Sequence, residues 1–263
     1  MDSIENILTI SQIIDKKQRF HVVRDGETPP LVPTASVCKL CNGVGYRREN
    51  VPYGHPNFGK ALECECKLAE QKKRLQQRLV ADSGILSLAL FETASFDSFD
   101  QSLPGVFDAH YHASLFAHDP SGWLILEGPY GCGKTHLAVA IAKARINAGD
   151  TIIVQTVPDL LDHLRSAFAP NSAQNYSELF ETMRNVDLLI LDDYGAQSDT
   201  PWALEKLFQL LNYRYNKALA TVITSNDLKS GDARLYSRMH DKRLVRKIDM
   251  EQARDYRVYG DEE

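Results

Sequence analysis

The stretch "GPYGCGKTH" at residues 128–136 constrains the fold of this chain more than any other feature. It matches the pattern G-x-x-x-x-G-K-[ST] at every fixed position, and it lies between the apolar run "WLILE" and a helical pattern. Gly128, Gly131 and Gly133 allow the backbone to turn so that its N–H groups point inward. The helix that follows adds the positive end of its dipole. The stretch therefore predicts a phosphate-binding loop between a strand and a helix.

Two side chains of this loop have predicted roles in binding ATP. Lys134 can reach the β- and γ-phosphates, and the Thr135 hydroxyl can ligate Mg²⁺. A chance glycine-rich loop is the alternative, but the adjoining strand and helix argue against it. The loop residues expected to contact the nucleotide are Gly128, Pro129, Tyr130, Gly131, Cys132, Gly133, Lys134, Thr135 and His136.

A pair of aspartates follows the apolar run "LLIL" at residues 188–191. A carboxylate at the C-terminal end of a buried strand lies beside the phosphate loop in sheets of this kind. We expect Asp192 to join Thr135 in holding Mg²⁺, through water because Mg²⁺ keeps several of its own waters. Asp193 is the predicted catalytic group that orients the attacking water. The alternative is that the two acids only cap the strand.

From about residue 103 onward, apolar strands alternate with amphipathic helices. The expected strands are "WLILEG", "TIIVQT", "VDLLILDD" and "LATVITSN", and the expected helices include 134–148 and 202–216. Such alternation indicates a parallel sheet covered on both faces, so we predict an α/β fold, a three-layer P-loop NTPase domain. Asn226, at the end of the last expected strand, can fix the lytic water or sense the γ-phosphate, although Asn is also a common turn residue.

Six basic residues gather in "GDARLYSRMHDKRLVRKI" at residues 231–248. A solvated basic helix is one interpretation. The other is that one arginine crosses a subunit interface to a neighbour's γ-phosphate, where a guanidinium suits the developing charge. The same stretch is the best place in the chain for contact with a nucleic-acid backbone. The net charge of −5 limits such contact to a local patch.

Four cysteines lie in two close pairs ahead of this unit, Cys38 and Cys41 in "CKLC" and Cys64 and Cys66 in "CEC". A reducing cytosol argues against disulfides and favours metal ligation. Zn²⁺ takes four ligands in a tetrahedron, so the four thiolates predict one structural zinc site. Buried thiols without a metal or a redox pair are the alternatives, and His55 between the pairs could replace one cysteine.

The cysteine unit is expected to be a separate domain. We predict a zinc-binding and partner-binding domain at residues 1–85, a linker at 86–102, and an ATPase domain without a helical lid at 103–263. A helical apolar repeat between Ile4 and Ile14 either packs on its own domain or docks onto a partner protein. The sequence shows neither a secretory signal nor a membrane span, so we expect a cytoplasmic protein.

Several motifs together resemble the AAA+ family, and within it the group of the helicase loaders DnaC and DnaI and the transposition ATPase IstB. The motifs, over roughly 90–258, are "GWLILEGPYGCGKTHLAVAIA", "LLILDDYGAQ", "WALEKLFQLLNYRYNKALATVITSN", "SRMHD" and "DYR". The resemblance implies an AAA+ domain in which Arg238 is the arginine finger and Asn226 the first sensor. It also implies self-association through the ATPase domain, binding of single-stranded DNA, and a ring-shaped replicative helicase as partner.

Two features depart from the common AAA+ pattern. Asp193 stands where most members have Glu, and a side chain shorter by one methylene suggests slow, switch-like hydrolysis. We also expect no helical lid after Asn226, which again resembles DnaC and IstB. Arg257 in "DYR" is the candidate for a second-sensor arginine.

Three functions are consistent with these features. A helicase loader is favoured, because the N-terminal domain of DnaI is likewise a zinc module that binds the helicase, whereas IstB proteins generally lack such a unit. An IstB-like ATPase that assists a transposase is the second hypothesis. A P-loop kinase for a small molecule is the third, and such enzymes usually need a lid and an acceptor pocket.

Overall fold

The computed structural model of the chain describes residues 38–82, 89–168, 175–228 and 232–259. The chain divides into two compact units, Met1–Cys64 and Glu65–Glu263. The described part of the first unit contains a short antiparallel hairpin of β1 (Tyr46–Arg47) and β2 (Leu62–Glu63). The helical repeat expected between residues 4 and 14 lies outside the described residues. No described helix is both long and apolar enough to cross a membrane.

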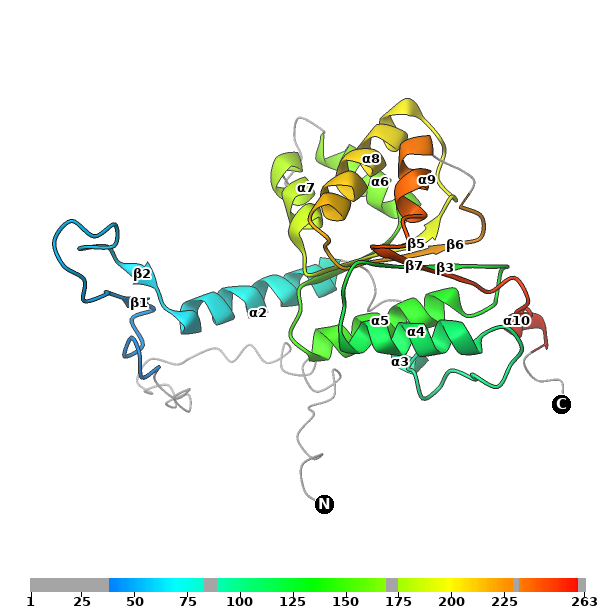
Figure 1. Cartoon of the computed structure of the whole chain (residues 1–263), viewed down its shortest axis with the longest axis horizontal. Helices are drawn as coiled ribbons and strands as arrows, with labels where there is room; N and C mark the ends of the chain where they lie inside the picture. The colour runs from blue at the N-terminus through cyan, green and yellow to red at the C-terminus, as the bar shows by residue number, and fades with distance from the viewer. Residues whose placement is uncertain (1–37, 83–88, 169–174, 229–231, 260–263) are drawn as a thin grey trace, which may run out of the picture. The chain divides into compact units, whose positions relative to one another are not determined.

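A parallel sheet of five described strands forms the centre of the second unit (Figure 1). The strands are β3 (Trp123–Glu127), β4 (Ile152–Thr156), β5 (Leu188–Tyr194), β6 (Thr221–Ser225) and β7 (Val245–Asp249). Their order across the sheet is β4-β5-β6-β3-β7. The strand before the phosphate loop therefore lies between β6 and β7, and β6 separates it from the strand that carries the two aspartates.

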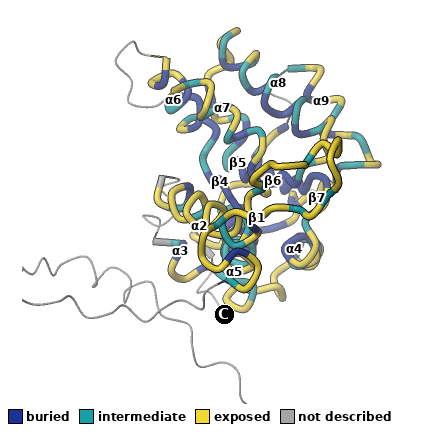
Figure 2. Tube along the Cα trace, turned by 90° about the vertical axis from the view of Figure 1, so that its left-hand side faces the viewer, coloured by how far each residue is buried: buried dark blue, intermediate teal, exposed yellow. Residues whose placement is uncertain are grey.

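Helices cover both faces of this sheet, which confirms the predicted three-layer α/β fold (Figure 1). The helices of one face are α3 (Ala89–Thr93), α4 (Phe107–His118) and α5 (Lys134–Asn147). Those of the other face are α6 (Val157–Ala167), α7 (Tyr176–Asn185), α8 (Pro201–Asn216) and α9 (Ala233–Met239). Buried residues line the strands, and exposed residues lie on the outer sides of the helices (Figure 2).

The two cores follow from the two-residue period of the strands. In β3, Leu124 and Leu126 belong to the core beneath α4 and α5. Trp123 and Ile125 belong to the core beneath the helices of the opposite face. Both faces of β3 are therefore apolar, as a strand inside a sheet covered on both sides requires.

The edge strand β7 differs from the elements expected from the sequence. Its residues belong to the basic stretch that the sequence allows as a helix, but α9 ends at Met239 and the chain returns as a strand. Val245 and Ile248 are buried while Arg246 and Lys247 are exposed. Because β7 pairs with β3 alone at the edge of the sheet, it can carry charged residues that a central strand could not.

The boundary between the units also differs from the expected one. The helix α2 (Glu65–Asp82), predicted to lie in the N-terminal domain, is part of the second unit. Gln76 donates a side-chain hydrogen bond to the Ile146 carbonyl oxygen at 2.7 Å, and Lys72 forms an ion pair with Asp187 at 3.0 Å. The first unit therefore ends before residue 85, because side chains of α2 bind to the ATPase core.

The segment predicted as a linker at 86–102 is, in its described part, packed into the second unit. Helix α3 falls within it, and Phe91 and Ala94 are buried in the core with residues of α4 and α5. The linker prediction is thus wrong for these residues. Single phenylalanines in the polar sequence "FETASFDSFD" do not reveal by spacing that they face inward.

Arg214, near the end of α8, is fully buried. Its guanidinium donates to the carbonyl oxygens of Arg184, Val186 and Ala220 at 2.9, 3.1 and 2.6 Å. Burial lowers the pKa of Arg214 to about 10, so the side chain is still protonated at neutral pH. One cation thus ties the end of α7 to the start of β6, and thereby helps to align β6 within the sheet.

Replacing Arg214 with Met should lower the free energy of unfolding by about 3 kcal/mol or more, because several buried carbonyl oxygens lose their donor. Urea unfolding of the full chain, followed by circular dichroism, measures this loss. The control is Arg165→Met, which removes an exposed arginine paired with Asp162 and should cost less than about 1 kcal/mol. Equal losses in the two variants would contradict the role given to Arg214.

Candidate functional site

The loop between β3 and α5 has the backbone geometry of a phosphate site. Gly131 and Gly133 have positive φ angles of 72° and 96°, which residues with a side chain rarely adopt. A Cβ atom on Gly133 would also lie 2.6 Å from the Phe99 ring. A glycine is therefore required at both positions, and the loop can curl around a phosphate group.

The Lys134 side chain is buried along its own loop. Its Nζ donates hydrogen bonds to the carbonyl oxygens of Gly128 and Pro129 at 2.8 and 2.7 Å, and lies 3.6 Å from the Cys132 sulfur. Phosphate oxygens bind an ammonium more strongly than these neutral partners do. A bound triphosphate could therefore exchange for them without a large movement of the lysine.

Asp192 lies where the ends of β5 and β6 meet the start of α5. The Thr135 hydroxyl is 3.1 and 3.0 Å from the two carboxylate oxygens of Asp192, and the Thr224 hydroxyl donates to one of them. Burial raises the pKa of Asp192, and the neighbouring charge of Asp193 adds to the rise. A divalent cation beside Asp192 and Thr135 would offset this buried negative charge. The oxygen donors fit Mg²⁺, which prefers oxygen ligands.

Asp193 lies at a bulge in β5. The register with β6 shifts between Leu191 and Tyr194, and Asp193 has a positive φ of 54°. Its backbone N–H donates to the Thr224 hydroxyl at 3.0 Å. Bulges next to functional sites re-aim a side chain, and Asp193 lines the same cavity as Lys134. The bulge thus brings Asp193 to the cavity, while its neighbour Asp192 contacts Thr135 and Thr224.

Asn226 follows β6 and lines the same cavity. Its Oδ1 atom is buried and has no hydrogen-bond partner among the described residues. Buried polar atoms are usually paired, so this acceptor fits a bound water molecule. Because β6 lies between β3 and β5, the Asn226 amide stands between the phosphate loop and Asp193.

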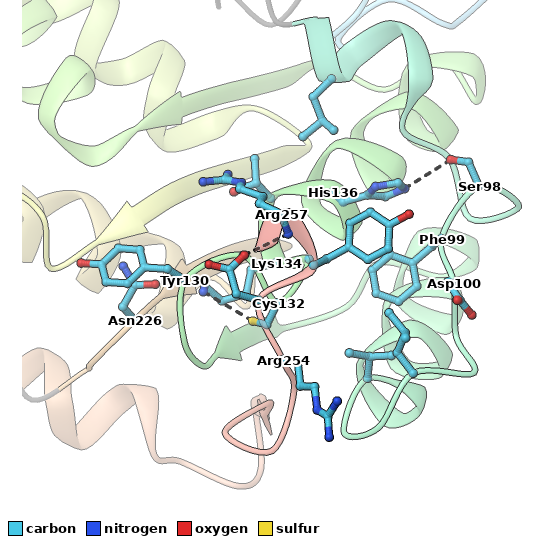
Figure 3. A pocket seen from close by; sticks show the side chains of 18 of the residues that line it. Ser98, Phe99, Asp100, Tyr130, Cys132, Lys134, His136, Asn226, Arg254 and Arg257 are labelled. Carbon is cyan, nitrogen blue, oxygen red and sulfur yellow. Dashed lines mark hydrogen bonds between the residues drawn. The ribbon is translucent and has the colours of Figure 1, made fainter. Parts of the chain in front are cut away.

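The cavity that these polar groups share has a volume of about 730 Å³ (Figure 3). This volume is in the usual range for sites that bind small molecules. One part of the wall is apolar and consists of Leu90, Leu103, Pro104 and Val106. The cavity therefore has an apolar part that suits a nucleotide base and a polar part that suits phosphates.

Another part of this wall consists of Ser98, Phe99 and Asp100, which the sequence analysis places in a linker (Figure 3). His136 Nε2 is 2.9 Å from the Ser95 carbonyl oxygen and 3.3 Å from the Ser98 hydroxyl. The Phe99 ring packs edge-on against His136, with 5.2 Å between ring centroids. Phe99 and Ser98 are site residues that the sequence analysis missed, because the local spacing in "FETASFDSFD" does not show which of its side chains face the cavity.

The short helix α10 (Tyr256–Tyr259) lies against the phosphate loop. The Tyr256 backbone N–H donates to the Gly131 carbonyl oxygen at 3.1 Å. Arg254 and Arg257 line the same cavity (Figure 3). Arg257 is therefore close to the predicted phosphate site, and its role as a second sensor stays a prediction.

Arg238 does not line the cavity of its own chain. It lies on α9, where its guanidinium donates to the Arg234 carbonyl oxygen at 2.8 Å. Two nearby arginines are neutralised by carboxylates, Arg234 by Asp232 at 2.5 Å and Arg243 by Asp241 at 2.8 Å. Arg238 forms no ion pair with any residue that the structure describes. No described carboxylate therefore balances the charge of Arg238.

Four sulfur atoms near the hairpin lie within 4.8 Å of one another, and they belong to Cys38, Cys41, Cys64 and Cys66. Those of Cys38 and Cys64 are 3.8 Å apart, which is about the edge of a tetrahedron with Zn–S bonds of 2.3 Å. The Gly45 backbone N–H points at the Cys41 sulfur at 3.3 Å, as second-sphere donors to metal-bound thiolates do. The four donors fit one zinc ion. In the described part of the chain this cluster does not include His55.

Comparison with known families identifies the chain. The profile of the family described as IstB-like ATP binding protein matches residues 63–249. The chain belongs to this family. The match covers α2 and all five described strands of the sheet. It includes the cavity residues from Leu90 to Asn226, whereas those at 254–257 lie beyond it.

Individual relatives are replicative helicase loaders. The DnaC protein of Buchnera aphidicola (strain Bp) is 29% identical over 168 residues, which cover 63% of this chain and 68% of that protein. The DnaI protein of Bacillus subtilis is 27% identical over 194 residues, which cover 71% of this chain and 61% of that protein.

Solved structures agree with the sequence relatives. A crystal structure of DnaI matches 63% of this chain and 92% of its own, with a TM-score of 0.50 and 26% identity. The replication initiator DnaA, solved with AMPPCP and single-stranded DNA, matches 59% of this chain and 49% of its own, with a TM-score of 0.53 and 20% identity. The second unit thus has the AAA+ P-loop fold, as predicted.

The cysteine cluster predicts a metal content that can be measured. The purified wild-type chain should contain about one zinc per molecule, and Cys64→Ser should lose most of it because three thiolates bind zinc more weakly than four. Inductively coupled plasma mass spectrometry measures the number of zinc ions per protein molecule. Cys132→Ser is the control, since Cys132 lies in the phosphate loop, and it should keep the metal. Equal zinc in all three proteins would rule out the assignment.

The Thr224 hydroxyl connects Asp192 with the backbone of Asp193, so its removal should disturb both aspartates. Thr224→Val keeps the shape of the side chain and should reduce ATP turnover by about 10- to 100-fold, as loss of a second-sphere partner commonly does. Phosphate release at saturating ATP measures the change. Thr182→Val, which removes a hydroxyl bound to the Glu178 carbonyl oxygen on α7, should leave turnover unchanged. Normal turnover in Thr224→Val would show that the aspartates need no such support.

Proposed function

We propose that the chain is an ATP-dependent loader of a replicative helicase. The observation that carries the proposal is the joining of a complete P-loop site to a four-cysteine unit, in a chain whose relatives include the loaders DnaC and DnaI. The loader would use ATP to control its grip on single-stranded DNA and on a ring-shaped helicase. It would act in the cytoplasm, where the replication machinery works.

The site residues have distinct roles in this proposal. Lys134 binds the β- and γ-phosphates, while Thr135 and Asp192 hold Mg²⁺, which neutralises phosphate charge when bound. Asp193 polarises the attacking water, and the unpaired amide oxygen of Asn226 positions it. An aspartate at position 193 reaches less far than a glutamate would. We therefore expect slow hydrolysis that a bound partner accelerates.

Arg238 supplies the remaining charge to a neighbouring copy of the chain. It lies outside its own cavity and has no carboxylate partner among the described residues. A guanidinium at a phosphate stabilises the charge that develops during transfer. Hydrolysis would then require self-association through the ATPase domain. ATP hydrolysis and the binding of DNA would therefore both depend on the oligomeric state.

The N-terminal part is proposed to recognise the helicase. A zinc ion held by four thiolates would be structural, since no coordination position is left for chemistry. Within the described residues 38–64 only Cys41 and Cys64 are buried, so such support would replace an apolar core there. Single-stranded DNA would contact the ATPase domain, whose local basic residues can bind phosphates although the net charge is −5.

The second candidate function is an ATPase that assists a transposase, because the matching family is described as IstB-like. The ATPase core fits both functions. The four-cysteine unit favours the loader, since it gives the chain a separate module for a protein partner. A small-molecule kinase is the least supported candidate. It would leave a phosphorylated product, whereas the proposed reaction releases phosphate.

A loading assay with the full chain tests the proposal. The chain, the replicative helicase of the same organism and circular single-stranded DNA are mixed with ATP, and helicase bound to the circles is measured by gel filtration. Helicase transfer should require ATP and fail with Lys134→Ala. Arg238→Ala should bind ATP normally but lose DNA-stimulated hydrolysis by about 10³-fold or more. Arg165→Ala, an exposed arginine on α6, is the control and should behave as wild type.

Two outcomes would overturn the proposal. The first is a chain that never binds the helicase but binds a transposase, which would establish the second candidate. The second is unchanged hydrolysis in Arg238→Ala. This result would show that Arg238 has no part in a site shared between copies, although the chain still binds ATP.

A further inference from the structure

Two aromatic rings of α8 lie beside the Arg238 guanidinium. Its central carbon is 5.3 Å from the centre of the Phe208 ring and 5.6 Å from that of the Tyr215 ring. Phe208 and Tyr215 are seven residues apart, so they share one face of the helix, and this face packs against α9. We infer that Phe208 and Tyr215 are positioning residues that hold Arg238 for the neighbouring copy's phosphate. The inference rests on the proposed function of Arg238.

Aromatic rings suit this task better than carboxylates. The negative face of a ring attracts a guanidinium by its quadrupole, yet it carries no net charge. The cation is therefore oriented without being neutralised. A carboxylate in the same place would compete with the incoming phosphate for the guanidinium. Arg238 has no carboxylate partner in the described part of the chain, and its Nε atom is buried without a hydrogen-bond partner there.

The contrast with Arg234, one turn earlier on α9, supports the assignment. Arg234 also stacks on Phe208, at 3.7 Å, but it is paired with Asp232 at 2.5 Å. Its charge is thus largely balanced within the chain, which weakens repulsion between the two guanidiniums. Arg234 fixes one side of the Phe208 ring and leaves Arg238 as the arginine whose charge is still available.

Tyr215 is itself held from two sides. Its ring packs edge-on against Trp123, with 6.0 Å between centroids and an angle of 84°. Its hydroxyl donates to Asp241, which also accepts from Arg243 at 2.8 Å. Trp123 begins β3, the strand that leads into the phosphate loop. Through Tyr215, the contact to Arg238 is thereby connected to Trp123 in β3, a buried strand of the same chain. This packing restricts the movement of the Tyr215 ring beside Arg238.

The test separates a positioning role from a general packing role. Phe208→Leu removes the ring but keeps an apolar side chain, and Phe208→Tyr keeps the ring. We expect Phe208→Leu to lower kcat for ATP by about three- to thirtyfold with little change in KM, the range of a partly desolvated cation–π contact. Phe208→Tyr should restore most of the rate. Phe180→Leu is the matched control, because Phe180 also lies under an arginine, Arg184, at 4.5 Å but on α7.

A mixing experiment shows whether the defect lies in the arginine that a copy donates. Lys134→Ala cannot bind ATP productively but keeps Arg238, so its copies can complete the site of a Phe208→Leu neighbour. The mixture should therefore hydrolyse more ATP than either variant alone. A Phe208→Leu defect in the copy's own nucleotide site would not be rescued. A mixture of Lys134→Ala and Arg238→Ala serves as the reference, because its gain in ATP hydrolysis over either variant alone shows how large a rescue to expect.

The outcomes decide between the inference and the function on which it rests. If Arg238→Ala loses hydrolysis but Phe208→Leu does not, the inference is wrong and the proposed function stands. If Arg238→Ala retains hydrolysis, the result contradicts both the inference and the proposed role of Arg238. If Phe208→Leu does not fold, Tyr215→Leu carries the same expectation, with Tyr215→Phe as the variant that keeps the ring. Loss of activity without rescue in the mixture also contradicts the inference.

Discussion

The rest of the nucleotide site depends on one hydroxyl. Thr224, at the end of β6, donates to the Asp192 carboxylate and accepts from the Asp193 backbone N–H. These two bonds join β6 to the bulged end of β5, and Asp192 in turn contacts Thr135 beside the phosphate loop. Because the carboxylate is buried, its unfavourable charge is tolerable only with such partners or a cation. The hydrogen bonds therefore fix the Asp192 carboxylate beside Thr135, where the proposed Mg²⁺ would bind.

The position of β6 explains why several separated segments act as one site. It lies between the strand of the loop and the strand of the aspartates, so Asn226 at its end stands between the phosphate loop and Asp193. Farther along the chain, Arg238 on α9 does not line this cavity. In the proposed mechanism each chain would therefore receive an arginine from one neighbouring copy and donate its own to another, so that hydrolysis would depend on assembly.

The cysteine unit and the ATPase unit use different sources of stability. The ATPase unit buries two apolar cores against the faces of its sheet. The smaller unit has a two-strand hairpin and three of the four neighbouring thiols, and the fourth belongs to Cys66 in the first turn of α2. Metal ligation would replace the missing core of the smaller unit. This division would suit the proposed loader, whose nucleotide state would change while the unit that recognises the helicase keeps its fold.

Local sequence by itself determined the phosphate loop, the α/β class and the four thiols. Each depends on residues close in sequence, such as Gly131 and Lys134, whose spacing reports backbone geometry directly. Only the tertiary structure decided the order of the strands, the place of β7, and the packing of α2 and residues 89–102 onto the ATPase core. It also decided the surroundings of Phe99 and Arg238. These depend on contacts between segments far apart in the chain, and local spacing carries no record of which distant side chain fills the space beside a ring or a guanidinium.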